Sequence, residues 1–137
     1  MKILLDTHYL LWAFIETKKI SPRILGELLS PENEVYYSQI SLWEISIKYN
    51  KGNLEIGGMN PEEFYEEVGN SYMISHQLRS EDLISFYRLP IEHKDPFDRM
   101  LVWQSIQSGY YFLSVDGKNE NYEKHGLKLF RQDPTRK

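Results

Sequence analysis

The sequence predicts an α/β fold in which a central parallel sheet of about five strands carries helices on both faces. Two observations predict it. Short apolar segments of strand length alternate with longer segments that have helix-start and helix-stop residues, as in βαβ units. The length of 137 residues suits one domain with its own core, so we expect residues 1–137 to form a single domain with a tail from about residue 131.

In the first half of the chain, residues that start helices follow each apolar segment. Thr7 is placed to cap one helix, and Ser21 followed by Pro22 is a cap with proline in the first helical turn. Gly52 ends a third helix. We expect strands over Lys2–Asp6 and Glu34–Ser38, and helices over His8–Ile15, Pro22–Leu29 and Gln39–Asn50.

The second half continues the alternation with shorter strands. Helices are expected from Asn60-Pro61, from Ser80 to Pro90 and from Asp95-Pro96 to Gly109, each beginning with a capping residue. Strands are expected over Tyr72–Ser75, Tyr110–Val115 and Leu127–Phe130, with a polar helical turn between Asp116 and His125.

Composition narrows the chemistry that this chain can perform. It has no cysteine, which excludes disulfides, a thiol nucleophile and cysteine-bound metals, and its four histidines lack the spacing of a zinc site. With 16 Lys and Arg against 20 Asp and Glu, the net charge is −4, which argues against a surface that binds nucleic acid all over but allows a local basic rim. The longest apolar run is far too short for a membrane span, so we expect a cytoplasmic protein.

Two aspartates follow apolar strands directly. Asp6 ends the first predicted strand and Asp116 ends the strand before the polar turn, and ligands of open parallel sheets bind at such strand ends. The alternative interpretation is that each carboxylate only caps the helix that follows it.

Two further acids lie on predicted helices beside apolar residues. Glu44 borders the stripe formed by Ile40, Trp43 and Ile47, although an ion pair with Lys48 on the helix surface would also explain it. Asp98 lies on the face that Leu101, Val102 and Ile106 make apolar, although a capping role beside Asp95 is the alternative. Four inward carboxylates without evident basic partners require a cation, and Mg²⁺ or Mn²⁺ suits an all-oxygen site.

The predicted acids lie in four segments of the chain: Leu4-Leu5-Asp6-Thr7-His8-Tyr9-Leu10-Leu11-Trp12, Ser41-Leu42-Trp43-Glu44-Ile45-Ser46-Ile47-Lys48, His93-Lys94-Asp95-Pro96-Phe97-Asp98-Arg99-Met100-Leu101 and Leu113-Ser114-Val115-Asp116. Together these segments resemble the PIN domain, and most closely the VapC-type toxins of bacterial toxin–antitoxin pairs. Each motif is weak by itself, but their order and spacing agree over nearly the whole chain. The chain departs from the family at Asn119, where relatives often have an apolar or aromatic residue.

The resemblance implies a three-layer α/β/α PIN-like fold in which the first and fourth strands are neighbours. It also implies that Asp6, Glu44, Asp98 and Asp116 line one metal pocket and are the catalytic residues. The implied activity is Mg²⁺- or Mn²⁺-dependent endoribonuclease cleavage of RNA by a metal-activated water. A cognate antitoxin is the implied protein partner, and we also expect a homodimer.

Residues next to these motifs receive weaker predictions. Lys48, Lys94 and Arg99 are expected to contact RNA phosphates, although solvated surface charges would look the same. Thr7, Ser114 and Asp95 are expected to orient metal ligands or water, although local capping is an equal explanation. The three tryptophans lie among apolar helix residues, which favours core or partner contacts over stacking on RNA bases.

Two functions of other classes remain as alternatives. A catalytically inactive PIN scaffold that serves as a binding module would have the same fold, and only an assay separates the two. A phosphoacceptor receiver domain also has acids at strand ends, but it needs an acidic pair after the first strand, and here Asp6 is followed by Thr7.

Overall fold

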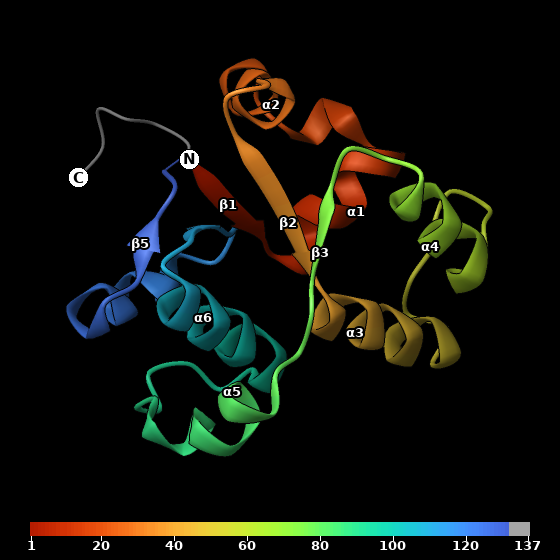
Figure 1. Cartoon of the computed structure of the whole chain (residues 1–137). Helices are drawn as coiled ribbons and strands as arrows, with labels where there is room; N and C mark the ends of the chain where they lie inside the picture. Colours follow the sequence, from red (N-terminus) through yellow and green to blue (C-terminus); the bar gives the residue numbers. More distant parts are fainter. Residues whose placement is uncertain (132–137) are drawn as a thin grey trace.

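Five parallel strands form one sheet in the order β3-β2-β1-β4-β5, in a computed structural model that describes residues 1–131 (Figure 1). The strands are β1 (Lys2–Leu5), β2 (Glu34–Ser38), β3 (Ile74–His76), β4 (Tyr111–Leu113) and β5 (Lys128–Leu129). The central strand β1 pairs with β2 on one side and with β4 on the other. The predicted five-stranded parallel sheet and the pairing of its first and fourth strands are therefore confirmed.

Helices and short 3₁₀ segments connect the strands. The α-helices are α1 (Thr7–Ile15), α2 (Pro22–Leu29), α3 (Gln39–Asn50), α4 (Pro61–Gly69), α5 (Ser80–Ser85) and α6 (Pro96–Ser108). The 3₁₀ segments are η1 (Thr17–Lys19), η2 (Phe86–Arg88) and η3 (Gly117–His125), of which η3 is the polar turn expected after Asp116. Helix α6 ends as predicted at Gly109, whose positive φ of 71° suits glycine.

The strands are buried on both faces, which explains their nearly continuous apolar sequences. Ile3 and Leu5 point into a core shared with α1, α2 and α4, whereas Leu4 points into a second core shared with α6. The neighbouring strand alternates in the same way, because Val35 joins the first core and Tyr36 the second. Two cores on opposite faces of one sheet confirm the predicted three-layer α/β/α arrangement (Figure 1).

The beginning of α1 differs from the prediction in a way that matters for the site. Strand β1 ends at Leu5, and the helix is capped by Asp6, whose side chain accepts a hydrogen bond from the backbone N–H of Tyr9. Thr7 is therefore the first helical residue and not the cap. Aspartate caps in this extended conformation because its carboxylate satisfies an N–H that has no partner inside the helix.

The weak elements of the second half are also shifted. Strand β3 begins two residues later and ends one residue later than predicted, because pairing with Tyr36 to Ser38 of β2 fixes its bounds. Helix α5 has no capping hydrogen bond from Ser80 and ends at Ser85, well before Pro90. At its start Arg79 instead forms an ion pair with the buried carboxylate of Asp82.

The sequence also predicts a C-terminal tail and a chain that does not span a membrane. The predicted C-terminal tail beyond residue 131 lies outside the described residues. Within residues 1–131, no helix has both the length and the apolar character required to cross a membrane.

Candidate metal centre

The predicted carboxylates gather at the carboxyl edge of the sheet, beside the boundary between β1 and β4. The strand order reverses at β1, and ligands of open parallel sheets bind outside the strand ends at such a point. A pocket of about 330 Å³ lies there. Its lining residues are Thr7, His8, Glu44, Asp95, Asp98, Val115, Asp116 and Gly117.

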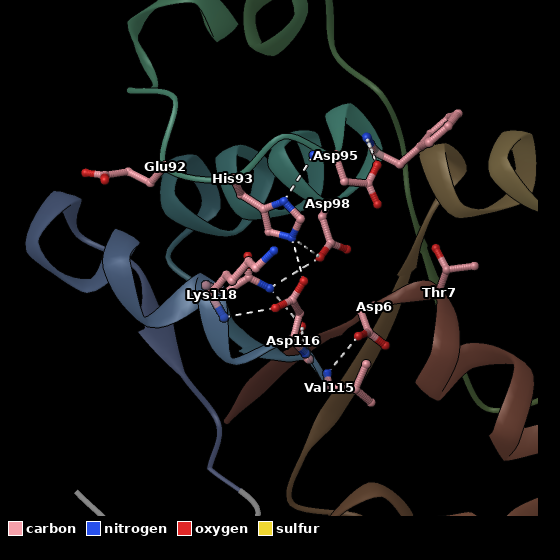
Figure 2. A network of polar contacts seen from close by, with 12 residues as sticks. Asp6, Thr7, Glu92, His93, Asp95, Asp98, Val115, Asp116 and Lys118 are labelled. Carbon is pink, nitrogen blue, oxygen red and sulfur yellow. Dashed lines mark hydrogen bonds and ion pairs between the residues drawn. The ribbon is translucent and has the colours of Figure 1, made fainter.

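Asp6 joins the two central strands at this edge. One oxygen, Oδ1, accepts the N–H of Tyr9 at 2.8 Å. The other, Oδ2, accepts the N–H of Val115 at 2.9 Å (Figure 2). Its side chain is almost completely buried, and burial raises the pKa of Asp6, although the two N–H groups oppose this effect. Asp6 therefore does cap a helix, as the alternative interpretation holds, and the same carboxylate also connects β1 to the segment that follows β4.

Glu44 occupies the side of the pocket formed by α3. It is buried, with one oxygen accepting a hydrogen bond from the Thr7 hydroxyl and the other paired with Lys48, each at 2.6 Å. The Thr7 hydroxyl also lies 2.9 Å from the hydroxyl oxygen of Ser41. The expectation that Glu44 lacks a basic partner is therefore wrong, because Lys48 supplies one, and the pair is half-buried instead of fully at the surface.

The predicted apolar stripe on α3 is wrong as well. Trp43 is 61% exposed and lies edge-to-face against Phe97, while Ile40, Glu44 and Ile45 form the buried side of the helix. Apolar residues occur around much of this helix, so their spacing does not identify the inward face. The other two tryptophans fit the core prediction better, since Trp103 is buried and Trp12 is partly buried against the first core.

Asp98 and Asp116 form the opposite side of the pocket, and a histidine lies between them. The Nε2 atom of His93 is 2.6 Å from Oδ2 of Asp116 and 3.3 Å from Oδ2 of Asp98 (Figure 2). One such atom from each of the three residues lies within 4.8 Å of the other two. A cluster of this size and composition is compatible with a divalent cation.

The two carboxylates differ in how much their surroundings favour the charged form. Burial raises the pKa of Asp98 to about 6, and the negative charges of Asp6 and Asp95 add to this effect. Burial also acts to raise the pKa of Asp116, but hydrogen bonds from the Lys118 N–H and from His93 outweigh it, and its pKa lies below the ordinary value. Of these two carboxylates, Asp98 therefore gains more from a bound cation.

Asn119 and Ser114 lie between these two acids and contact both of them through hydrogen bonds. The amide nitrogen of Asn119 donates to Ser114 Oγ at 2.8 Å and lies 3.5 Å from Asp98 Oδ2, and its side chain is fully buried. Ser114 also accepts the N–H of Asp116 at 3.1 Å. The polar residue at position 119 is thus part of the site, where the resemblance predicts an apolar one.

The remaining predicted residues, Asp95, Arg99 and Lys94, have different surroundings in the structure. Asp95 is the N-cap of α6, as the alternative interpretation proposes, and accepts the N–H of Phe97. Arg99 points its guanidinium at the carbonyl oxygen of Leu89 and over the ring of Phe86, whereas Lys94 is exposed near the pocket. The predicted contacts of these cations with RNA remain predictions.

Sequence reasoning used His93 as part of a motif but missed its place at the centre of the site. Histidine spacing gave no signal, because His93 acts together with aspartates from α6 and from the end of β4 and not with a second histidine. Its position two residues before the cap of α6 could have indicated it, since that position brings the ring close to the first turn of the helix.

The sequence and the fold of the chain were both compared with those of known proteins. The family model of the PIN domain matches residues 3–124. No curated protein sequence matches the chain.

Several solved structures share the fold. VapBC2 from Rickettsia felis, bound to a DNA fragment from its promoter, matches with a TM-score of 0.70 at 17% identity, over 95% of this chain and 98% of that one. VapBC-1 from nontypeable Haemophilus influenzae matches with a TM-score of 0.64 at 16% identity, over 96% and 98%. DNA-bound VapBC from Salmonella typhimurium gives 0.63 at 17% identity, over 97% and 99%.

Proposed function

Because the chain belongs to the PIN domain family, we propose that it is a Mg²⁺- or Mn²⁺-dependent endoribonuclease and the toxin of a toxin–antitoxin pair. One observation supports the metal dependence most directly. Asp98 and Asp116 belong to one close cluster, Asp6 is near enough for its charge to raise the pKa of Asp98, and within residues 1–131 no lysine or arginine forms an ion pair with any of the three. Buried carboxylates without such partners favour a cation.

In this proposal Asp6, Asp98 and Asp116, together with Glu44, hold the metal. The bound cation would lower the pKa of a water molecule and neutralise negative charge on the phosphodiester. The chain's own groups set the geometry: the N–H groups of Tyr9 and Val115 fix the Asp6 carboxylate, and the Thr7 hydroxyl fixes that of Glu44. Each carboxylate is thereby oriented before a ligand arrives.

Charges at the rim of the pocket would receive the RNA backbone. Lys94 is exposed next to Asp95, and the Lys48 side chain is partly exposed beside Glu44. Phosphate contacts by such side chains would add affinity that falls with salt and carries no sequence information. Arg99 remains a weaker candidate, because its guanidinium already contacts the Leu89 carbonyl.

The proposed antitoxin partner is supported by surface chemistry and by shared fold. Exposed apolar side chains lie on and after α5, on Leu83, Ile84, Tyr87 and Ile91. Patches of this kind suit either an antitoxin or the second copy of a homodimer. The structures with the same fold named above are VapBC assemblies. A basic side chain of an antitoxin could enter the acidic pocket in place of the metal.

Cleavage of single-stranded RNA by the purified protein tests the activity. We expect cleavage with Mg²⁺ or Mn²⁺, none in excess EDTA, and none by an Asp6→Asn, Asp98→Asn double variant. A Glu66→Gln, Glu67→Gln double variant is the matched control, because it neutralises two exposed acids of α4 outside the site. Equal cleavage in EDTA, or wild-type cleavage by the aspartate variant, would contradict the proposal.

Binding to the product of the neighbouring gene tests the regulatory half separately. We expect a small protein with a basic tail to co-purify with this chain and to suppress cleavage. A neighbouring protein that neither binds nor inhibits would leave a nuclease without the proposed antitoxin.

A further inference from the structure

Both ring nitrogens of His93 contact other residues at the site. Its ring is buried, its Nε2 atom faces Asp98 and Asp116, and its Nδ1 atom accepts the backbone N–H of Asp95 at 3.0 Å. All three contacts come from residues that the proposed function places in or beside the metal site. The role of the ring therefore depends on which nitrogen carries the proton.

The contact with Asp95 decides the position of that proton. A nitrogen that accepts an N–H must have a free lone pair, so Nδ1 carries no hydrogen. In the neutral imidazole the hydrogen is then on Nε2, the atom that faces the two carboxylates. Nε2 is a donor in this arrangement and has no lone pair to offer to a metal.

We infer that His93 is a positioning residue: its Nε2–H holds Asp98 and Asp116 side by side, and the ring does not bind the metal itself. This inference rests on the proposed metal site. The hydrogen bond of Nε2 is to Oδ2 of Asp116 at 2.6 Å, and Oδ2 of Asp98 lies 3.3 Å from the same nitrogen, where the positive end of the N–H dipole faces both carboxylates. Oδ1 of Asp98 faces away from His93 and is left for the cation, whereas Oδ1 of Asp116 also accepts the backbone N–H of Lys118 at 2.9 Å and has one lone pair left to offer.

The segment that carries His93 is fixed independently of any ligand. The buried hydroxyl of Tyr122, in η3, accepts the N–H groups of Glu92 and His93 and donates to the carbonyl oxygen of Pro90. Glu92 is also paired with His125 and Lys124 of the same segment. Since η3 follows Asp116 directly, these contacts hold donor and acceptor in one rigid unit, which is what a positioning role requires.

The test measures Mn²⁺ binding, by calorimetry and by the signal of free Mn²⁺, and not activity. His93→Gln keeps an N–H donor near the position of Nε2, whereas His93→Ala removes it. We expect binding by His93→Gln within about threefold of wild type, and a loss of about 10- to 100-fold in His93→Ala, as for other groups that orient metal ligands. His76→Gln, in β3 and outside the lining of the pocket, is the matched control and should not change the affinity.

Pulsed electron paramagnetic resonance of the Mn²⁺-loaded wild type gives a direct readout of the ligands. We expect no imidazole nitrogen coupling from His93. A nitrogen coupling that disappears in His93→Gln would overturn the inference, because the ring would then be a ligand. Equal losses of affinity in His93→Gln and His93→Ala, or tighter binding in His93→Ala, would overturn it too. If wild type binds no Mn²⁺, the proposed metal site itself fails, which distinguishes that failure from one confined to His93.

Discussion

The two sides of the pocket contain carboxylates whose charge is balanced in different ways, and their burial falls from Glu44, 5% exposed, through Asp98, 15%, to Asp116, 32%. On the α3 side, Glu44 has a lysine one turn later on its own helix and a threonine hydroxyl from α1. On the α6 side, the Nε2 atom of His93 lies between Asp98 and Asp116, and the amide of Asn119 lies 3.5 Å from Asp98. Neither carboxylate forms an ion pair with a lysine or arginine among residues 1–131. The α3 side is therefore electrostatically complete by itself, whereas the α6 side is not.

This difference shows that the effect of burying a carboxylate depends on the charges beside it. A buried carboxylate beside a cation is a structural pair, which is costly to break but has little need of a ligand. A buried carboxylate beside other carboxylates is destabilised in its charged form until a cation arrives, and the raised pKa of Asp98 expresses this. We expect metal binding to depend more on the α6 side than on the α3 side.

The largest expected effect is on RNA cleavage. Asp98→Asn should lower the Mn²⁺-dependent rate by at least about 100-fold, because it removes charge from the side that lacks a balancing cation. Glu44→Gln should lower the rate less, because Lys48 already balances that carboxylate. Initial rates on one RNA substrate, at saturating metal, check this. Equal losses in the two variants would remove the distinction between the two sides.

The second effect is on stability without metal. The folded-state pKa of Asp98, about 6, lies above its ordinary value of 3.8. The folded protein therefore binds more protons between these values, and its stability should fall as pH rises from about 4 to about 6. Asp98→Asn should lose this dependence and be as stable as wild type or more so at pH 7, by up to about 2 kcal/mol.

Urea unfolding in EDTA at pH 4.5 and pH 7 measures this difference. Added Mn²⁺ provides the complementary test, since it should raise the melting temperature of wild type and not that of Asp98→Asn. If Asp98 only supported the start of α6, its loss would instead cost about 0.5–2 kcal/mol, and Mn²⁺ would stabilise neither protein.

A smaller effect of opposite sign is expected on the α3 side. Lys48→Met leaves the buried Glu44 carboxylate without its cation, so the free energy of unfolding should fall by about 1–2 kcal/mol, less than for a fully buried pair because Lys48 is partly exposed. Lys51→Met, at the exposed end of α3, is the matched control and should change stability by less than about 0.5 kcal/mol. A Lys48 variant as stable as this control would mean that the pair contributes nothing.

The smallest expected effect concerns the hydroxyl that orients Glu44. Thr7→Val removes the donor to Glu44 Oε1 at nearly constant shape, and the unfolding free energy should fall by about 1 kcal/mol. Thr17→Val, in the exposed η1 segment, provides the comparison and should have little effect. Chemical denaturation of both variants is sufficient, and a stable Thr7→Val protein would indicate that water replaces the hydroxyl.

Much of the architecture could be predicted because its signals are local. Capping residues with proline placed the beginnings of α2, α4 and α6, and α3 was predicted with the bounds that the structure has. The inward face of α3 was predicted wrongly, because Trp43 is apolar and yet exposed. Helical periodicity identifies a buried face only where polar residues mark the other side.

The sequence by itself determined the order of elements and the acids at strand ends, since each depends on neighbours within a few residues. It also indicated the parallel sheet, because strands that alternate with helices along the chain pair in parallel. Tertiary structure decided which charges meet. Lys48 pairs with Glu44 on the same helix, and the sequence offered this pair as an alternative. The second contact of Glu44, with the hydroxyl of Thr7, comes from another helix and has no signal in the local sequence. His93 meets Asp116 across 23 residues, and the hydroxyl of Tyr122 helps to fix the segment of His93 onto η3. Such contacts have no local signal, because the free energy that forms them comes from packing between distant elements.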